Sequence, residues 1–319
     1  MEDLFIGHTA IVLAAVALDL LLGDPHWLPH PVVFIGKLVN TLEKLLRRHV
    51  RHELAGGAFL LALTVGIVAA VAWLVIEAAF LLHPVVGFAL SALLGWTCLA
   101  ARSLHRESNR VADALRMGDL EGARRSLSCI VGRDTAELDE PAIWRATVET
   151  VAENSSDGVI APLFCLMLGG PVLALAYKAI NTLDSMVGYK NEAYLRFGWA
   201  SARCDDLANW IPARLTGLLM VLAAPLAGLS APRAWWIMLR DGRNHASPNS
   251  GIPEGAAAGA LGVQLGGASS YFGKRVEKPT IGDPLHPLAS ADYRGAVRLM
   301  YGAEAVLAAA WLVTHHFSR

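Results

Sequence analysis

Charged residues are scarce in this chain of 319 residues. Asp, Glu, Lys and Arg together make up 17% of it, whereas a typical soluble domain contains roughly 25%. Hydrophobic residues make up 54%, a balance that favours an integral membrane protein over a soluble one. The formal net charge is only −1, so the sequence lacks the basic footprint of a nucleic-acid-binding protein, and we expect no nucleic-acid partner.

Cysteine is scarce as well, and its placement argues against the usual metal and disulfide frameworks. The four cysteines lie far apart and form no C-x-x-C pair, so we expect free thiols. The first apolar stretch is preceded by Glu2 and Asp3 rather than by Lys or Arg, and it lacks a small-residue cleavage site. We therefore expect no cleavable signal peptide.

Apolar stretches long enough to span a bilayer are abundant. His83-Pro84 predicts a tight turn between two of them, and the basic residues on both flanks of this hairpin place those flanks in the cytoplasm by the positive-inside rule. We count five or six spanning segments, drawn from residues 4–22, 55–82, 85–101, 158–177, 211–229 and 297–313.

These stretches predict an all-α fold, a polytopic membrane helical bundle, as one membrane-embedded domain over residues 1–319. Residues 102–157 are expected to form a cytoplasmic helical insertion, and residues 230–296 a polar loop that carries motifs. Gly169-Gly170-Pro171 predicts a broken or re-entrant hairpin from 158 to about 187, with both ends in the cytoplasm. The active site would then face the cytoplasm from the cell (inner) membrane.

Helix signals divide the predicted insertion into three helices. Residues 106–115 and 120–130 show amphipathic patterns, and Gly118-Asp119 separates them. Pro141 stands where a further helix should begin.

Acidic motifs lie directly beside the apolar stretches, where charge is costly and usually functional. Glu149, Glu153 and Asp157 are spaced i, i+4, i+8, so they should share one helical face. Three such carboxylates repel one another unless a cation lies between them, and Mg²⁺ prefers a few carboxylates together with phosphate oxygens. The alternative is a solvated acidic face that ends in a cap.

Two further motifs carry charge in the second half of the chain. Lys178, Asn181 and Asp184 should share a helical face at i, i+3, i+6, either as part of a site or as a buried ion pair that stabilises the bundle. Asp205 and Asp206 form an acidic pair next to Arg203, although adjacent aspartates point to different sides of a helix.

The densest polar block covers residues 240–254. Its arginines, hydroxyls and backbone N–H groups suit phosphate binding, and a plain surface loop is the alternative. Gly242, Gly251 and Gly255 should leave this block flexible when it is empty.

Five motif blocks together resemble the CobD/CbiB family of membrane-bound cobalamin-biosynthesis proteins. The resemblance covers nearly the whole chain in the expected order, and its motifs are long and unlike common patterns. The blocks are LDLLLGDP at 18–25 followed by His30-Pro31, ETVAENSSDG at 149–158, KAINTLDSMVGY at 178–189, Asp205-Asp206 through Pro212-Ala213-Arg214, and SPNSGIPE at 247–254.

The resemblance implies adenosylcobinamide-phosphate synthase activity. Such enzymes use ATP and Mg²⁺ to join adenosylcobyric acid to aminopropanol phosphate (or aminopropanol) through an amide bond. The partners would be this corrinoid, the amine, the lipid bilayer and other cobalamin-assembly membrane enzymes.

The chemistry requires a metal on the ATP phosphates, cations on the transferred phosphoryl group and a base for the ammonium. Asp205 is a further metal candidate, and Lys178 a further phosphate-binding one. Our assignments are catalysis by His245, Lys178 and Asp205; nucleotide binding by Arg203, Arg240, Arg243, Ser247, Asn249 and Ser250; and Mg²⁺ binding by Glu153, Asp157 and Asp184.

Two other classes of protein remain possible. A non-catalytic membrane regulator similar to AmpE would keep the helices and lose the acidic motifs, which this chain retains. A transporter built on broken helices would explain Gly169-Gly170-Pro171 but not the polar block at 240–254. ATP consumption that depends on both substrates would distinguish the enzyme from either alternative.

Overall fold

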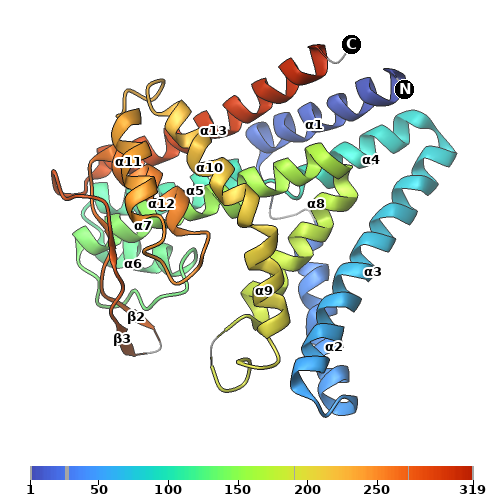
Figure 1. The fold of residues 1–319 in the computed structure, drawn as a ribbon, viewed down its shortest axis with the longest axis horizontal. Coiled ribbons are helices and arrows are strands. Elements are labelled where there is room, and N and C mark those ends of the chain that lie inside the picture. The colour runs from blue at the N-terminus through green and yellow to red at the C-terminus, as the bar shows by residue number, and fades with distance from the viewer. Residues whose placement is uncertain (1, 26–28, 190, 272, 318–319) are drawn as a thin grey trace. The chain divides into compact units, whose positions relative to one another are not determined.

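The computed structural model describes residues 2–25, 29–189, 191–271 and 273–317, and most of them are helical (Figure 1). Within the described residues, four helical stretches are long and apolar enough to cross a membrane: Glu53–Leu82, Pro84–Arg116, Glu140–Val187 and Ser290–Thr314. Two further apolar helices, Gly7–Leu22 and Trp210–Ala223, are too short to count as candidate spans. The four long stretches make the protein an all-α, multi-pass membrane helical bundle, and the predicted fold class is confirmed.

Internal contacts divide the chain into two compact units, which are described separately. Unit 1 comprises Met1–Ala100 and Ala161–Asn209, and unit 2 comprises Ala101–Ile160 and Trp210–Arg319. The expectation of a single domain over 1–319 stays a prediction.

The regular secondary structure described in unit 1 is all helical. His83 separates α3 from α4 as the sequence predicts, because its imidazole accepts the Val85 N–H and Pro84 occupies the first turn of α4. The resulting α3–α4 hairpin is visible in Figure 1. The helices are α1 (Glu2–Leu22), α2 (Pro31–His49), α3 (Glu53–Leu82), α4 (Pro84–Trp96), α8 (Ala161–Val187) and α9 (Trp199–Ala208).

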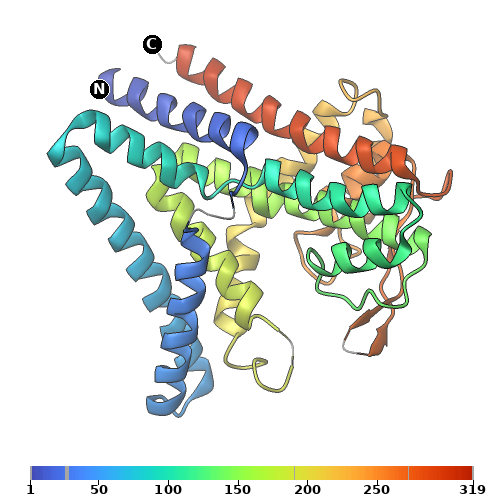
Figure 2. The same cartoon turned by 180° about the vertical axis from the view of Figure 1, so that it is seen from behind.

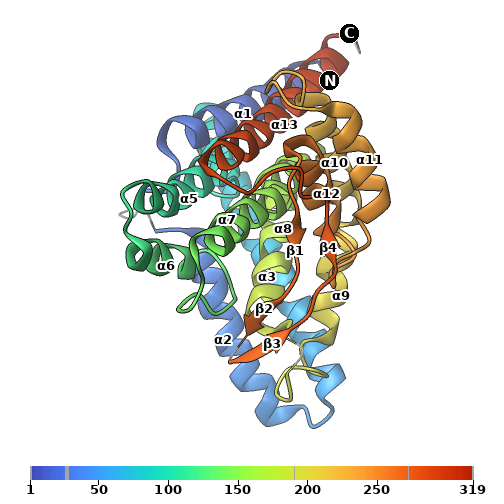
Figure 3. The same ribbon diagram turned by 90° about the vertical axis from the view of Figure 1, so that its left-hand side faces the viewer.

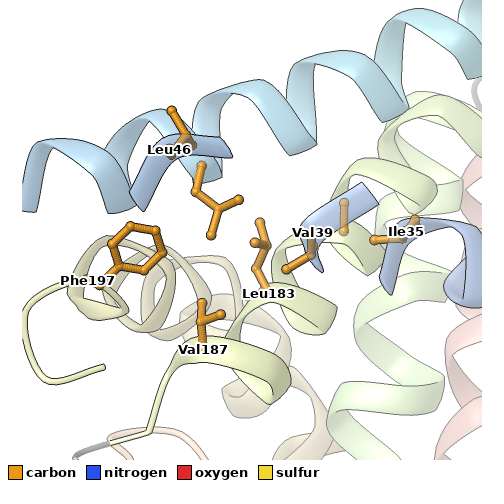
Figure 4. Close-up of a cluster of buried hydrophobic side chains, with 8 residues drawn as sticks. Ile35, Val39, Leu46, Leu183, Val187 and Phe197 are labelled. Atoms are coloured by element: carbon orange, nitrogen blue, oxygen red, sulfur yellow. The ribbon is translucent and has the colours of Figure 1, made fainter. Parts of the chain in front are cut away.

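A cluster of aliphatic and aromatic side chains joins α2, α3 and α8 to the segment before α9 (Figure 4). Val39 and Leu183 are fully buried at its centre, and Phe197 closes one end. The guanidinium of Arg47 lies 4.0 Å from the Phe197 ring centroid, so a cation–π contact covers this end of the cluster.

Helix α8 is broken where the sequence predicts it. Gly169 and Gly170 leave helical geometry, and Gly170 adopts φ 65°, which a residue without a Cβ tolerates. Pro171 has no N–H for the Met167 carbonyl one turn earlier. His8 of α1 satisfies this carbonyl instead, with its Nε2 2.9 Å from the oxygen. The break is confirmed, whereas the expectation that both ends of the segment lie in the cytoplasm stays a prediction.

Unit 2 contains the three helices that the sequence predicts between 102 and 157. Asp119 caps α6 and Asp139 caps α7, each accepting a backbone N–H with its carboxylate. Figure 2 shows α5 beside α13. The helices are α5 (Ala101–Arg116), α6 (Leu120–Ser128), α7 (Glu140–Asn154), the π-helix η1 (Ser155–Ile160), α10 (Trp210–Ala223), α11 (Ala231–Asp241), α12 (Gly251–Leu261) and α13 (Ser290–Phe317).

The predicted polar loop at 230–296 is instead largely structured. It contains α11, α12 and two short antiparallel ladders, in which β1 (Leu265–Gly266) pairs with β4 (Thr280–Ile281) and β2 (Ser269–Tyr271) pairs with β3 (Lys274–Val276) (Figure 3). Helix α12 is built from Gly and Ala and is buried all round, so it has no amphipathic period that a sequence pattern could reveal.

Candidate functional site

Unit 2 encloses a polar cavity of about 180 Å³. It is lined by residues from α7, α12, the strands β1, β2 and β4, the segment between β3 and β4, and the loops before α7 and α12. The charged and titratable side chains of this lining are Arg133, Glu149, Glu153, His245, Glu254, Tyr271 and Lys278.

Glu149 holds one wall of the cavity together. Arg133 places its Nη2 2.6 Å from Glu149 Oε2, and the Gly266 N–H donates to Oε1 over 2.7 Å. The two side chains are 18% and 5% exposed, so this ion pair lies largely out of water. Burial opposes the charge on Arg133, but the Glu149 carboxylate outweighs it and raises the pKa of Arg133.

Glu153 lies one helical turn further along α7 and also lines the cavity. Its Oε1 accepts a hydrogen bond of 2.8 Å from the Ser250 hydroxyl. The expected i, i+4 relation of Glu149 and Glu153 is therefore confirmed, and it directs both carboxylates into the same cavity.

Asp157 is not among the residues that line the cavity. It lies in the π-helix that follows α7, Ser155–Ile160. The prediction that three acids share one helical face is confirmed for Glu149 and Glu153, and for Asp157 it stays a prediction. A π-helix cannot be read from side-chain spacing, although such bulges are frequent at functional sites.

Glu254 is the most unusual side chain of the cavity. It is only 4% exposed, and its carboxyl group has no hydrogen-bond or ion-pair partner among the residues that the structure describes. Burial, together with the nearby Glu153 and Glu149 carboxylates, raises the pKa of Glu254 well above its usual value. A buried, unpaired carboxyl group that faces a cavity is an expected feature of a functional site.

His245 also lines the cavity, and its hydrogen bond determines which ring nitrogen carries the proton. Burial lowers the pKa of His245, so the ring is neutral near pH 7, although Glu153 opposes this shift. Nδ1 accepts the Ser247 N–H over 3.1 Å. The proton of the neutral ring is then on Nε2, which makes this nitrogen a donor rather than a base. The predicted role of His245 as the base stays a prediction, and this geometry does not favour it.

Lys278 adds a positive charge to the otherwise acidic lining and lies next to Tyr271. The Lys278 ammonium donates to the Tyr271 hydroxyl and lies 4.7 Å from its ring centroid. Lys278 is only half-buried, so its remaining N–H groups are accessible to a ligand.

Hydrogen bonds within the polar block at 240–254, together with one from Arg214 of α10, hold it in place. The Ser247 hydroxyl accepts the backbone N–H groups of Asn249 and Ser250, and Asn249 accepts a 2.6 Å hydrogen bond from Arg214. A Cβ on Gly242 would lie 2.4 Å from the Met238 carbonyl, so this glycine allows close packing. The expected flexibility of the empty block stays a prediction.

The two arginines of this block are placed differently. Arg240 forms ion pairs with Asp241 and Asp283 at 2.7 and 2.8 Å, so its charge is already neutralised. Arg243 is exposed. Neither lines the cavity, and phosphate binding by Arg240, Arg243, Ser247, Asn249 and Ser250 stays a prediction.

A second polar cluster lies in unit 1, between α8 and α9. The Tyr177 hydroxyl donates to Asn209 Oδ1 over 2.8 Å, and Asn209 Nδ2 donates to Asp205 Oδ2 over 3.0 Å. The other oxygen, Asp205 Oδ1, is buried and has no hydrogen-bond partner in the described part of the chain. Burial and the neighbouring Asp184 raise the pKa of Asp205 to about 7.

The remaining assigned side chains of unit 1 lie on the same two helices. Lys178 is half-buried on α8, on the face that carries Asp184. Arg203 is largely exposed on α9, 3.5 Å from Asp206. Within the described ranges, no group of three or more His, Cys, Asp or Glu side chains is placed to hold a metal ion. The Mg²⁺ assignments of Glu153, Asp157 and Asp184 therefore stay predictions.

Sequence reasoning missed several residues of the cavity. Arg133 stands alone in a loop and belongs to no motif. Glu254 and Lys278 appeared only as members of polar runs. One usable signal exists, since Glu254 is the single acid in a stretch of Gly and Ala that becomes a buried helix.

Comparison with known proteins relates nearly the whole chain to one family. Residues 12–300 match the family model described as CobD/Cbib protein. The chain is 73% identical over 298 residues to the cobalamin biosynthesis protein CobD of Geobacter metallireducens, which covers 93% of this chain and 94% of that protein. It is 48% identical over 302 residues to the cobalamin biosynthesis protein CbiB of Salmonella typhi, with coverage of 93% and 94%. No solved structure matches the chain.

Proposed function

Because this chain belongs to the CobD/Cbib protein family, we propose that it acts in cobalamin biosynthesis as an ATP-dependent amide ligase. The proposed reaction joins adenosylcobyric acid to aminopropanol phosphate and yields adenosylcobinamide phosphate. The observation that carries the proposal is that family-motif residues of unit 2 meet in one cavity: Glu149 and Glu153 from one block, and Glu254 from another. We place the reaction at the cytoplasmic face of the cell membrane.

A carboxylate is a poor electrophile, so the proposed route activates it first. The corrinoid carboxylate attacks the γ-phosphorus of ATP, which gives an acyl phosphate and ADP. The ammonium of the second substrate gives one proton to a base, and the free amine attacks the acyl carbon. The bond from carbon to the phosphate oxygen breaks, and the second amine proton leaves with the phosphate.

ATP and Mg²⁺ are proposed to bind at the polar cluster of unit 1. Mg²⁺ is usually held by one or two carboxylates together with phosphate oxygens and water. Asp184 and Asp205 supply such a pair, and the buried Asp205 Oδ1 without a hydrogen bond fits a hard cation. Lys178 and Arg203 lie on the same helices and would bind the phosphates. The metal would neutralise charge on the nucleotide.

The cavity of unit 2 supplies the acid–base groups in this proposal. Its carboxylates are candidates for the proton acceptor, and the Nε2–H of His245 is a donor for an anionic oxygen.

The proposal is tested with the full chain purified in lipid nanodiscs. ADP formation is measured with ATP, Mg²⁺, adenosylcobyric acid and aminopropanol phosphate, and then with each component omitted. We expect ADP only when both organic substrates are present. ATP hydrolysis that ignores both substrates, or its complete absence in the full mixture, would overturn the ligase and favour a transporter or a non-catalytic regulator.

A further inference from the structure

The cavity of unit 2 is too small and too acidic for a nucleotide. Sites for drug-sized ligands measure roughly 300–1,000 Å³, whereas this cavity measures about 180 Å³. This volume suits a ligand as small as a three-carbon amino alcohol phosphate better than it suits a nucleotide.

The charge of the lining points to the same kind of ligand. Arg133 is already paired with Glu149, whereas Glu153 and Glu254 have no ion-pair partner among the described residues. Lys278 is the other cation of the lining. Two unneutralised acids and one accessible cation would repel a polyanion, but they complement a small molecule with an ammonium at one end and a phosphate at the other.

Glu254 is the side chain that a bound cation would stabilise most. An ionised carboxylate that is 4% exposed and unpaired is costly, and a protonated one leaves its hydrogen-bonding capacity unused. An ammonium in the cavity would supply both the charge and the hydrogen bonds that Glu254 lacks. Ser250 already donates to Glu153 Oε1, which leaves Oε2 as an acceptor for the same ammonium.

We propose that this cavity is the binding site of the amine substrate, a small primary amine that carries a phosphate. Glu254 and Glu153 bind its ammonium, and Lys278 binds its phosphate. This inference rests on the proposed ligase function and adds the location of one substrate. The amine would bind in unit 2, and the nucleotide at the polar cluster of unit 1.

Binding is measured directly by isothermal titration of the full chain in nanodiscs, without ATP or corrinoid. The probe is 1-amino-2-propanol phosphate, and the comparison ligands are 1-amino-2-propanol, which lacks the phosphate, and isopropyl phosphate, which lacks the amine. We expect both comparison ligands to bind at least tenfold more weakly than the probe, since each loses one charged contact. Equal binding of isopropyl phosphate would overturn the assignment of the acids.

Variants identify the residues involved. Glu254→Gln should weaken probe binding at least tenfold, whereas the matched Glu137→Gln, at an exposed position of the same unit, should leave it unchanged. Lys278→Met, at a half-buried position between β3 and β4, provides a second variant in case Glu254→Gln does not fold. It should weaken binding of the probe but not of 1-amino-2-propanol.

Two outcomes would overturn the inference. One is wild-type affinity for the probe in both Glu254→Gln and Lys278→Met, and the other is competitive displacement of the probe by Mg²⁺–ATP. Because the titration contains neither ATP nor corrinoid, its result is independent of ligation. If the protein binds the probe through Glu254 but forms no amide, the ligase function is refuted while the amine-binding site is confirmed.

Discussion

Removing Arg133 should destabilise unit 2 through the charge that it leaves behind. Its guanidinium is 2.6 Å from Glu149 Oε2, and the two side chains are 18% and 5% exposed. Breaking a buried ion pair from one side costs ~3–5 kcal/mol, because the remaining charge is desolvated and unpaired. Glu149 keeps the hydrogen bond from the Gly266 N–H, so we expect Arg133→Met to cost about 3 kcal/mol, the lower end of this range.

Thermal unfolding followed by tryptophan fluorescence measures this cost, since Trp144 is buried on α7 next to the affected wall. A cost of 1 kcal/mol lowers the midpoint by roughly 2–4 °C in a unit of this size, so Arg133→Met should lower it by about 6–12 °C. The exposed Arg125→Met on α6 is the matched control and should change it little.

The double variant Arg133→Met/Glu149→Leu separates the ion pair from simple loss of packing. Replacing both charges with apolar side chains removes the unpaired carboxylate, so the double variant should be more stable than the sum of the single effects predicts. A midpoint within about 2 °C of wild type for Arg133→Met, or strictly additive effects, would show that this ion pair does not stabilise unit 2.

Four further predictions each concern a single residue. The pKa of Asp205 is raised from 3.8 to about 7, so the folded protein binds this proton more tightly than the unfolded chain does. The ionised Asp205 therefore lowers the free energy of unfolding, fully above pH 7, and this loss of stability disappears as the pH falls toward 4. Asp205→Asn should therefore raise the unfolding midpoint more at pH 8 than at pH 6, and equal shifts would contradict this. His8→Leu should cost ~1–3 kcal/mol in the same assay, because the Met167 carbonyl loses its donor, whereas a neutral result would mean that another group satisfies it. Arg240→Ala should leave the apparent KM for both phosphorylated substrates unchanged, since Asp241 and Asp283 already neutralise this arginine; a selective rise would restore its phosphate role. A cysteine at Glu192, on a background without native cysteines, should resist an impermeant maleimide in intact cells, and labelling there would refute the cytoplasmic placement of this segment.

Local signals predicted the helical framework well. The turn at His83-Pro84, the break at Gly169-Gly170 and the separation of two helices at Gly118-Asp119 each follow from the chemistry of one or two residues. Such signals survive in any tertiary context because they concern N–H groups and backbone angles within a few residues.

The candidate site was predicted less completely, because it depends on contacts between distant segments. Arg133 lies in the loop before α7, whereas Glu149 lies on α7 itself. Glu254 reaches the same cavity only because α12 packs closely in unit 2. The π-helix after Asn154 is a second feature that side-chain spacing does not reveal. Neither effect leaves a periodic pattern in the sequence.

Activation of the corrinoid carboxylate by phosphoryl transfer from ATP can be followed with adenosylcobyric acid labelled with ¹⁸O in its free carboxyl group. After a single round of reaction with ATP, Mg²⁺ and aminopropanol phosphate, mass spectrometry is applied to the phosphate and to the corrinoid product. We expect ADP, an amide product that has lost one labelled oxygen, and inorganic phosphate that has gained it. Label in AMP, or amide formed with unlabelled phosphate, would rule out the acyl phosphate.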